Sequence, residues 1–504
     1  MKYRRIIRTG PSSVTRWRGL YPLAVIGRPH SPQRGAGSDS SMLPKRSTRM
    51  DASSLRPLIH NKLSAASRSP SESNCSAWCR NSATSCAQCC SLSKDCISVS
   101  CIRSPSPQKS DSLQYNAQQW VGLDMLGEPH YKDIDVDVNQ EEGAMEFGIF
   151  FVRECRDRNF RKAYEEMIAQ TEYAEELGFD SVWLAEHRSS DYGSMPSMPV
   201  PLAALAMRTK RMRLGTLGTI LPLHNPLQVA AEYAMVDNLS GGRVEIALGR
   251  GYQPSEFASW GMELKETREK FWEGLDLMIR AWTAKEPLTF HGKYYRCENL
   301  DLRPRPLQQP YPRVHILTLS PETFELVARR GLDMAVTPTA MPFEMLKERI
   351  QTARRILVET GRTEDDISMP FLVQVHVAPT REEARRRTEE SVRWYFSTLL
   401  RLIPRGYEQY EYFTALAEQF TGEVDYDMIV NNSISWIGTP DDIAEKIRVV
   451  RDELGIRRFV AWFQFGGLDH RYVMDSMKLF AREVMPEFRS PQVPQAPVTA
   501  ESRA

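Results

Sequence analysis

Residues 214–251, LGTLGTILPLHNPLQVAAEYAMVDNLSGGRVEIALGRG, read as a strand, a helix and a second strand. The run Leu214–Leu221 is apolar and broken only by two glycines, which is typical of a short strand buried on both faces. Asn225 and Pro226 then open the helix, because asparagine caps helices well and proline suits the first helical position. Val244–Leu248 is the second strand, so this stretch predicts a parallel βαβ unit.

An arginine between two glycines, Gly249-Arg250-Gly251, follows the second strand of this unit. The glycines allow a close approach of the backbone, and the guanidinium offers two parallel donors to a phosphate. An arginine that pairs with a structural carboxylate would fit the same sequence. Arg250 is therefore a candidate phosphate ligand, and the spacing alone leaves both interpretations open.

From Met145 onward, strands and helices alternate regularly. The predicted strands are 146–152, 181–185, 214–221, 244–248, 314–317, 334–337, 371–377 and 458–465. Eight such units predict an α/β fold of the (β/α)8 TIM barrel type with insertions, over residues 145–489. A doubly wound open sheet is the alternative, but no GxGxxG follows the first strand. We expect residues 490–504 to form a disordered tail.

The first 144 residues are a different kind of sequence, rich in serine, arginine, proline and cysteine, with no sustained helical or strand period. Residues 1–110 hold 18 basic and 4 acidic side chains, and seven of the nine cysteines lie between Cys75 and Cys101. A zinc site, a targeting peptide and a disordered tail are three explanations. An upstream region translated from a misplaced start is the fourth, which we favour because Met145 directly precedes the first predicted strand.

The cysteine content of the predicted barrel and the lengths of the apolar runs limit the class of protein. Cys155 and Cys297 are the two cysteines left for the barrel, which suits a reducing cytoplasm. No uncharged apolar run approaches 18 residues, so we expect no membrane span. We predict a cytoplasmic protein that binds neither membrane nor nucleic acid.

In a TIM barrel the chemistry lies at the carboxyl ends of the strands. Glu154 and Cys155 follow the first predicted strand, and Glu186, His187 and Arg188 follow the second. His187 is a candidate acid–base residue, with Glu186 placed to orient its ring, although most lone histidines are structural. The histidines share no ligand spacing and HExxH is absent, so we predict no metal site.

A second candidate anion site follows the fifth predicted strand, where Ser320-Pro321-Glu322-Thr323 opens a helix. The free N–H groups and the dipole of a helix N-terminus attract anions. An ordinary capped helix start has the same sequence, so Ser320 alone is a weak signal. Its position on the strand next to the one that carries Arg250 strengthens the phosphate interpretation.

Four stretches between Met145 and Phe488 together resemble the bacterial luciferase family of flavin-dependent monooxygenases. They are LGFDSVW at 177–183 with AEH at 185–187, the whole of 214–251, SPET at 320–323 and IGTPDDIA at 437–444. The resemblance covers the predicted barrel and not the first 144 residues. It implies a TIM barrel that binds a flavin at its rim.

The resemblance also implies roles for individual residues. His187 matches the active-site histidine and Glu256 a nearby carboxylate. The cofactor-binding positions that it implies are Leu217 and Gly218 (a non-proline cis peptide under the flavin ring), Arg250, Tyr252, Ser320 and Thr323. Arg188, Gly249 and Leu319 depart from the family pattern, so the resemblance carries an expectation of flavin binding but not of light emission.

The activity that the resemblance implies is oxidation of a small aldehyde- or ketone-like substrate by O₂ and reduced FMN, through a C4a-peroxyflavin. A separate flavin reductase would supply the reduced FMN, and the family suggests a dimer. Two alternatives remain, an F420-dependent oxidoreductase of the same fold and a non-catalytic flavin-binding protein. The candidate lids are the loop Tyr192–Pro199 and the crossover 381–436.

Overall fold

Every structural statement below concerns the residues that the computed structural model describes: 144–338, 341–363, 367–403 and 423–489. The extension predicted for residues 1–144, apart from Ala144, and the tail predicted for 490–504 lie outside these residues. The amide of Met145 donates to the carbonyl of Phe488 at 2.9 Å. The first and last described segments of the barrel therefore meet.

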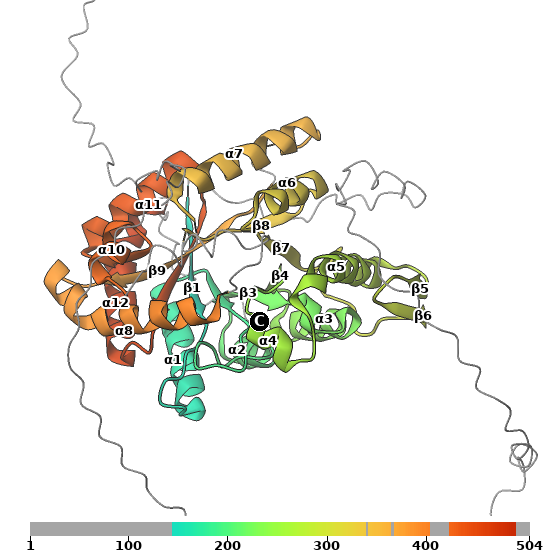
Figure 1. Ribbon diagram of the computed structural model, residues 1–504, viewed down its shortest axis with the longest axis horizontal. Helices are drawn as coiled ribbons and strands as arrows, with labels where there is room; N and C mark the ends of the chain where they lie inside the picture. Colours follow the sequence, from blue (N-terminus) through green and yellow to red (C-terminus); the bar gives the residue numbers. More distant parts are fainter. Residues whose placement is uncertain (1–143, 339–340, 364–366, 404–422, 490–504) are drawn as a thin grey trace, which may run out of the picture. The chain divides into compact units, whose positions relative to one another are not determined.

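Eight parallel strands form the central ring (Figure 1). They are β1 (Glu146–Phe151), β2 (Ser181–Leu184), β3 (Arg213–Ile220), β4 (Val244–Gly249), β7 (Arg313–Leu317), β8 (Asp333–Ala335), β9 (Pro370–Val377) and β11 (Arg458–Gln464). Hydrogen-bonded neighbours run in the order β9-β11-β1-β2-β3-β4-β7-β8. A parallel bridge between Val336 and Phe371 then joins the end of β8 to β9. The predicted TIM barrel is confirmed.

Helices alternate with these strands and surround them (Figure 1). The longer ones are α1 (Phe160–Leu177), α2 (Pro199–Arg208), α3 (Pro226–Ser240), α5 (Thr267–Thr283), α6 (Pro321–Arg330), α7 (Phe343–Glu359), α8 (Arg381–Leu402), α11 (Pro440–Leu454) and α12 (His470–Glu483). The short helices are α4 (Pro254–Ser259), α10 (Tyr426–Asn431) and three 3₁₀ turns at Leu221–Leu223, Leu264–Glu266 and Met485–Phe488.

The capping residues predicted from the sequence are present at α3. The Asn225 side chain accepts hydrogen bonds from the amides of Leu227 and Gln228, at 2.9 and 3.4 Å. Gly241 ends the helix with a φ of 71°, a left-handed conformation that glycine adopts without a steric penalty. The stretch 214–251 therefore forms the predicted strand, helix and strand.

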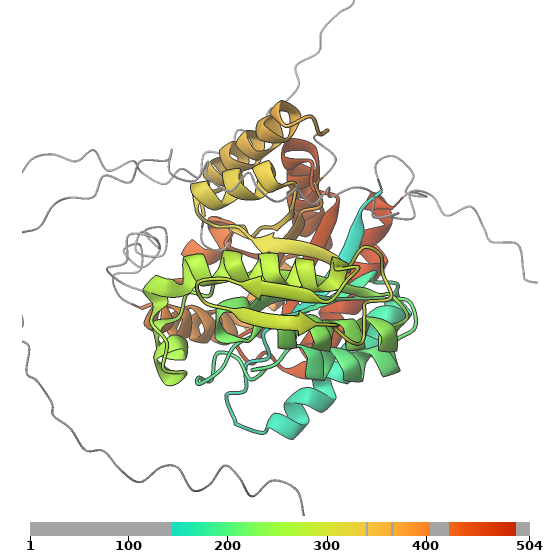
Figure 2. The same cartoon turned by 90° about the vertical axis from the view of Figure 1, so that its right-hand side faces the viewer.

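Two insertions were not predicted from the sequence. β5 (Leu288–His291) and β6 (Arg296–Leu300) form an antiparallel hairpin beside α5, which faces the viewer in Figure 2. β10 (Ser435–Gly438) pairs with the carboxyl half of β9. Within the predicted crossover 381–436, the described residues include helices α8 and α10, while 404–422 lie outside the description.

The side chains of the strands divide between two apolar clusters. Phe371, Val373 and Val375 of β9 belong to the cluster that packs against the surrounding helices. Leu372 belongs to a second cluster with Trp183 of β2, which fills the ring and continues under α8. This alternation follows from the period of two along a strand, and it places α8 over apolar side chains of the barrel.

Candidate functional site at the carboxyl rim of the barrel

His187 and Glu256 meet at the carboxyl ends of β2 and β4. The Nδ1 atom of His187 lies 3.2 Å from Oε1 of Glu256, and both side chains are buried. The same carboxylate oxygen accepts a 2.7 Å hydrogen bond from the amide of Arg188. Gln253, which sequence reasoning missed, places its Nε2 atom 3.3 Å from Nδ1 of His187. Nδ1 of the imidazole therefore faces both a carboxylate and a side-chain amide.

The expectation that Glu186 orients His187 is wrong. Glu186 lies 2.8 Å from Nε2 of His224, accepts from the amide of Ile220 at 3.0 Å, and forms an ion pair with Arg188. Neighbouring side chains at a strand end point in different directions, so proximity in sequence misleads. Glu256, far along the chain, takes the orienting position.

Arg188 lies in a cluster of its own beside this pair. Its guanidinium contacts Glu186, donates to the Pro196 carbonyl at 3.1 Å and lies over the Trp260 ring at 4.6 Å. Burial, together with the Arg188 charge, lowers the pKa of His224 to about 4. His224 is therefore neutral near pH 7, and the cluster holds the loop after β2 to the start of α3.

Three tyrosines extend from the same imidazole: Tyr192 and Tyr395 are buried, and Tyr252 is partly buried. The Tyr252 hydroxyl accepts from Gln253 at 3.2 Å and donates to the Tyr192 hydroxyl at 3.4 Å. The hydroxyls of Tyr192 and Tyr395 lie 2.8 Å apart, and the His187 ring packs edge-on against Tyr192. Burial raises the pKa of all three hydroxyls well above the ordinary value, so they stay protonated. We call Tyr252, Tyr192 and Tyr395 the tyrosine chain.

Glu154 is a second buried carboxyl group at the rim. Its Oε1 atom accepts from the amide of Gly466 at 3.1 Å, whereas Oε2 has no hydrogen-bond partner among the described residues. Burial raises the pKa of Glu154 to about 7, against the lowering effect of its hydrogen bonds and of Arg153. The candidate noted after the first strand is therefore a group that can exchange a proton near neutral pH.

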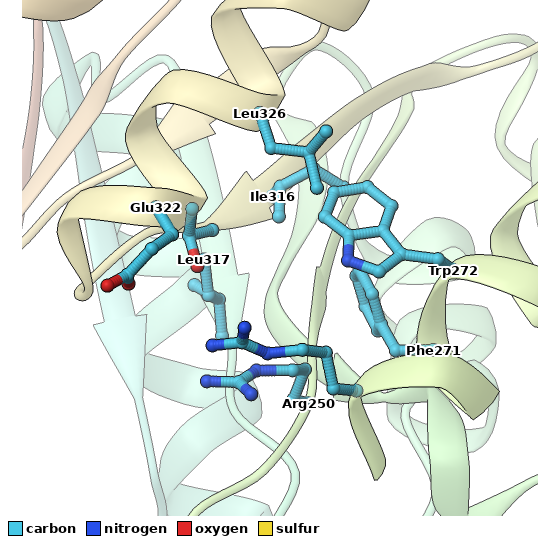
Figure 3. Close-up of a pocket in the computed structure, with 9 residues that line it drawn as sticks. Arg250, Phe271, Trp272, Ile316, Leu317, Glu322 and Leu326 are labelled. Atoms are coloured by element: carbon cyan, nitrogen blue, oxygen red, sulfur yellow. The ribbon is translucent and has the colours of Figure 1, made fainter. Parts of the chain in front are cut away.

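A cleft lies between β4, β7, α5 and α6, and Arg250 and Thr323 line it. In Figure 3 the Arg250 side chain lies below Leu317, with Phe271 and Trp272 to one side and Glu322 to the other. Arg268 of α5 also lines the cleft, and sequence reasoning missed it. Two guanidinium groups and a hydroxyl in one cleft suit a phosphate.

Ser320 does not cap its own helix with its side chain. Its hydroxyl lies 2.9 Å from the Thr323 hydroxyl and accepts from no helix amide. Burial would raise the pKa of Glu322, but its own backbone amide, the Ser320 hydroxyl and the charges of Arg268 and Arg250 outweigh burial and lower it. A carboxylate therefore lies at this helix N-terminus near the two arginines.

The peptide between Leu217 and Gly218 is cis, as the family resemblance implies. The Gly218 carbonyl accepts from the amide of Glu186 at 3.2 Å. A Cβ atom on Gly218 would lie 2.7 Å from the Ala247 carbonyl oxygen, so the strands leave no room for a side chain there. The Tyr252 side chain belongs to the tyrosine chain and does not line the Arg250 cleft. The phosphate contact that the resemblance implies for Tyr252 is through its main chain and stays a prediction.

Within the described part of the chain, no group of three or more His, Cys, Asp and Glu side chains is placed to hold a metal ion. None of the helices in that part has the length and apolar character that a membrane crossing requires. A (β/α)8 barrel with a buried histidine–carboxylate pair and a two-arginine cleft on one rim is an arrangement typical of barrel enzymes that bind a phosphate-bearing ligand.

A family model described as luciferase-like monooxygenase matches residues 145–458, and the chain belongs to this family. The chain is therefore an oxidoreductase. It is 28% identical over 324 residues to 4-hydroxyprotoasukamycin monooxygenase of Streptomyces nodosus subsp. asukaensis, with 63% of this chain and 85% of the relative covered. It is 23% identical over 355 residues to the oxygenase component of flavin-dependent trigonelline monooxygenase of Acinetobacter baylyi, with 69% and 97% covered.

Solved structures share the fold. The monooxygenase RslO1 from Streptomyces bottropensis superposes with a TM-score of 0.59 at 28% identity, over 68% of this chain and 100% of that one. The oxygenating constituent of 3,6-diketocamphane monooxygenase from Pseudomonas putida, in complex with FMN, gives 0.57 at 22% identity, over 69% and 100%. An F420-dependent secondary alcohol dehydrogenase gives 0.55 at 20% identity, over 69% and 100%.

Proposed function

We propose that this chain is the oxygenase of a two-component flavin-dependent monooxygenase, which oxidises an aldehyde- or ketone-like substrate with O₂ and reduced FMN. The observation that carries the proposal is the pair His187–Glu256 on the same rim as the cleft of Arg250 and Arg268. The trigonelline relative is named an oxygenase component, which supports a separate flavin reductase as partner. The FMN complex of the camphane monooxygenase supports the choice of flavin.

The residues present fit a flavin mononucleotide. Arg250 and Arg268, with the Thr323 hydroxyl, would hold the terminal phosphate, which carries up to two negative charges. The Leu217–Gly218 segment would lie under the ring system. When bound, a reduced flavin supplies the electrons that activate O₂. Glu322 has the same sign of charge as the phosphate and limits its affinity.

His187 is the residue that we propose to move a proton. Its Nδ1 atom faces Glu256 and Gln253, so Nε2 is the atom that exchanges a proton with the reacting groups. Oε1 of Glu256, 3.2 Å from Nδ1, fixes the orientation of the ring. The apolar cluster inside the barrel, with Trp183 and Trp462, excludes water and strengthens these electrostatic interactions.

Anaerobic titration of the full chain with reduced FMN and with reduced F420 tests the cofactor, and admission of air with candidate aldehydes and ketones then tests the reaction. We expect tighter binding of FMN and O₂-dependent formation of an oxidised product. Tighter binding of F420, with hydride transfer and no consumption of O₂, would assign the chain to the alternative that the F420-dependent neighbour represents.

The variant His187→Gln tests the catalytic assignment. We expect kcat to fall by about 10²- to 10⁴-fold, the usual size of an acid–base contribution, while the Kd of reduced FMN changes little. His291→Gln is the matched control, because His291 lies in the exposed β5–β6 hairpin. Unchanged turnover of His187→Gln would remove the catalytic role and favour a flavin-binding protein that does not act as an enzyme.

We also propose that the protein is a dimer. Large apolar side chains on α2 and α3 are exposed, with Val200 at 70% and Met207 at 71% on α2, and Met235 at 52% and Leu239 at 53% on α3. These two helices pack against each other, and exposed apolar patches of this kind mark interfaces. Sedimentation of the wild type and of Met235→Lys tests this face, and we expect the variant alone to be monomeric.

A further inference from the structure

The Nδ1 atom of His187 faces two groups with opposite demands. Oε1 of Glu256, at 3.2 Å, accepts hydrogen bonds and requires a proton on Nδ1. Nε2 of Gln253, at 3.3 Å, donates and requires the lone pair of Nδ1. One nitrogen cannot serve both groups, so the proton resides on Nδ1 or on Nε2 according to which neighbour prevails.

The tyrosine chain determines how Gln253 presents its amide. If Tyr252 donates to Tyr192 and Tyr192 donates to Tyr395, the Tyr252 oxygen is an acceptor and the Gln253 amide nitrogen turns toward it. If instead Tyr395 donates to Tyr192 and Tyr192 donates to Tyr252, the Tyr252 hydroxyl donates to Gln253. Gln253 must then present its amide oxygen to Tyr252 in place of the amide nitrogen. The buried Oε1 atom of Gln253 has no partner among the described residues, so the first orientation leaves its oxygen unsatisfied.

Tyr395 is the last member of the tyrosine chain, and aromatic side chains pack around its ring. It lies on α8, and its ring packs edge-on against Trp462 and Phe396, each at 5.0 Å between centroids. Glu154 interacts electrostatically with both Tyr192 and Tyr395. The Tyr252 hydroxyl donates to Tyr192 at 3.4 Å, and this direction of donation leaves Tyr252 as the acceptor from Gln253 at 3.2 Å.

We propose that Tyr395 is a positioning residue that acts through Tyr192, Tyr252 and Gln253 to set which ring nitrogen of His187 carries the proton. Helix α8 would thereby control which nitrogen of His187 is protonated. Tyr395 lies 203 positions from Tyr192 in sequence. The inference rests on the proposed catalytic role of His187 for its functional meaning. The hydrogen-bond coupling itself can be measured without turnover.

The test is the variant Tyr395→Phe, observed by NMR of the full chain labelled with ¹⁵N-histidine. Without Tyr395 as acceptor, Tyr192 donates to Tyr252, Gln253 turns its oxygen toward Tyr252 and His187, and the proton moves to Nδ1. We expect the Nδ1 resonance of His187, assigned by its loss in His187→Gln, to move toward the position of a protonated nitrogen. An unchanged His187 spectrum in folded Tyr395→Phe would overturn the proposal.

Tyr426→Phe is the matched control. Tyr426 is buried in the same apolar cluster, and its hydroxyl lies 3.2 Å from the Thr388 hydroxyl of α8, outside the tyrosine chain. The variant Tyr426→Phe should leave the His187 spectrum as in the wild type. If Tyr395→Phe does not fold, Tyr192→Phe breaks the chain one step closer to Tyr252, and an unchanged spectrum there would overturn the proposal equally. Full turnover of His187→Gln would refute the proposed function and leave the NMR result standing.

Discussion

The two ends of the barrel bury carboxylates in opposite ways. At the amino ends of the strands, both oxygens of Glu245 accept from Arg458 at 2.8 Å, and Arg213 and His315 add further bonds. At the carboxyl ends, Glu154 accepts one hydrogen bond from Gly466 and leaves its second oxygen without a partner among the described residues. We call Glu245, Arg213, Arg458 and His315 the floor network.

The electrostatic consequences are opposite as well. Burial would raise the pKa of Glu245, but the charges of Arg458 and Arg213 hold it well below the ordinary value. Burial raises the pKa of Glu154 to about 7, because its hydrogen bonds and the charge of Arg153 do not offset burial. Glu245 keeps its charge near neutral pH and serves stability, whereas Glu154 at the rim changes protonation near neutrality.

Removal of the floor carboxylate should have the largest effect. Glu245→Gln removes the buried carboxylate that pairs with Arg458 and with the partly exposed Arg213, while Arg458 keeps its ion pair with Glu146. We expect a loss of about 3 kcal/mol in the free energy of unfolding. Urea denaturation at pH 7 measures this loss. Glu298→Gln is the control, since its ion pair with Arg296 is exposed and contributes little to stability. Equal stability of the two variants would show that the floor network does not hold the barrel.

Removal of the rim carboxyl group of Glu154 should raise the stability at high pH, whereas removal of the Glu245 carboxylate should lower it. The pKa of Glu154 is raised in the folded state, so its contribution to stability is full below about pH 4.5 and is lost as pH rises through about 7. Glu154→Gln cannot ionise, and we expect it to be more stable than the wild type at pH 8.5 by about 3 kcal/mol, with the difference shrinking toward pH 4.5. Thermal unfolding at both pH values measures the contrast.

A constant offset between Glu154→Gln and the wild type at every pH would contradict this prediction. It would mean that the glutamine changes packing or hydrogen bonding and that Glu154 does not titrate with folding. Asp427→Asn, at an exposed position on α10 that pairs with Arg385, provides the control for loss of a surface carboxylate.

Regular local signals made most of the fold predictable. The strands are short apolar runs that end at capped helices, and Asn225 or Thr439 marks a helix start from sequence alone. The β5–β6 hairpin escaped prediction because its strands are short and half exposed, so they lack a buried apolar run. β10 has four residues and depends on its pairing with β9.

The candidate site was predictable only where a motif carried it. Arg250 and His187 were candidates because each follows a predicted strand, and the family resemblance added the cis peptide after Leu217. Arg268 and Tyr395 reach the rim from helices whose local sequence contains no sign of a site, and Gln253 next to Tyr252 looks like an ordinary loop residue. Their contacts are long-range, so only the folded chain brings them to His187 or to the cleft.

At the rim, the next largest effect should come from Arg250. Because an arginine contact to a charged group contributes about 1.5–3 kcal/mol, we expect Arg250→Ala to raise the Kd of reduced FMN by about 10- to 100-fold. The unfolding free energy should change far less than in Glu245→Gln. Arg296→Ala, an exposed arginine of the hairpin, is the matched control. Wild-type affinity in Arg250→Ala would place the phosphate elsewhere.

Glu322 tests the same cleft with the opposite sign. It lies near Arg250 and Arg268, and its charge repels a bound phosphate. We expect Glu322→Gln to lower the Kd of reduced FMN by about two- to fivefold, the range of a partly solvated charge interaction. The gain should shrink at high salt because screening weakens the repulsion. Weaker binding in this variant would indicate that Glu322 contacts the flavin directly.

The smallest expected effects concern the N-termini of two helices. The start of α11 has a structural cap, and the start of α6 lies at the rim. The Thr439 hydroxyl accepts from the amide of Asp442, whose carboxylate accepts from the amide of Thr439, so both groups cap α11. The Ser320 hydroxyl instead bonds Thr323 and caps no amide of α6. We expect Thr439→Ala to cost about 1 kcal/mol of stability with no change in flavin binding. Ser320→Ala should cost less than half of that and weaken FMN binding severalfold, because the Ser320 hydroxyl lies 2.9 Å from that of Thr323, which lines the cleft. Equal losses of stability would show that both serve their helices alone.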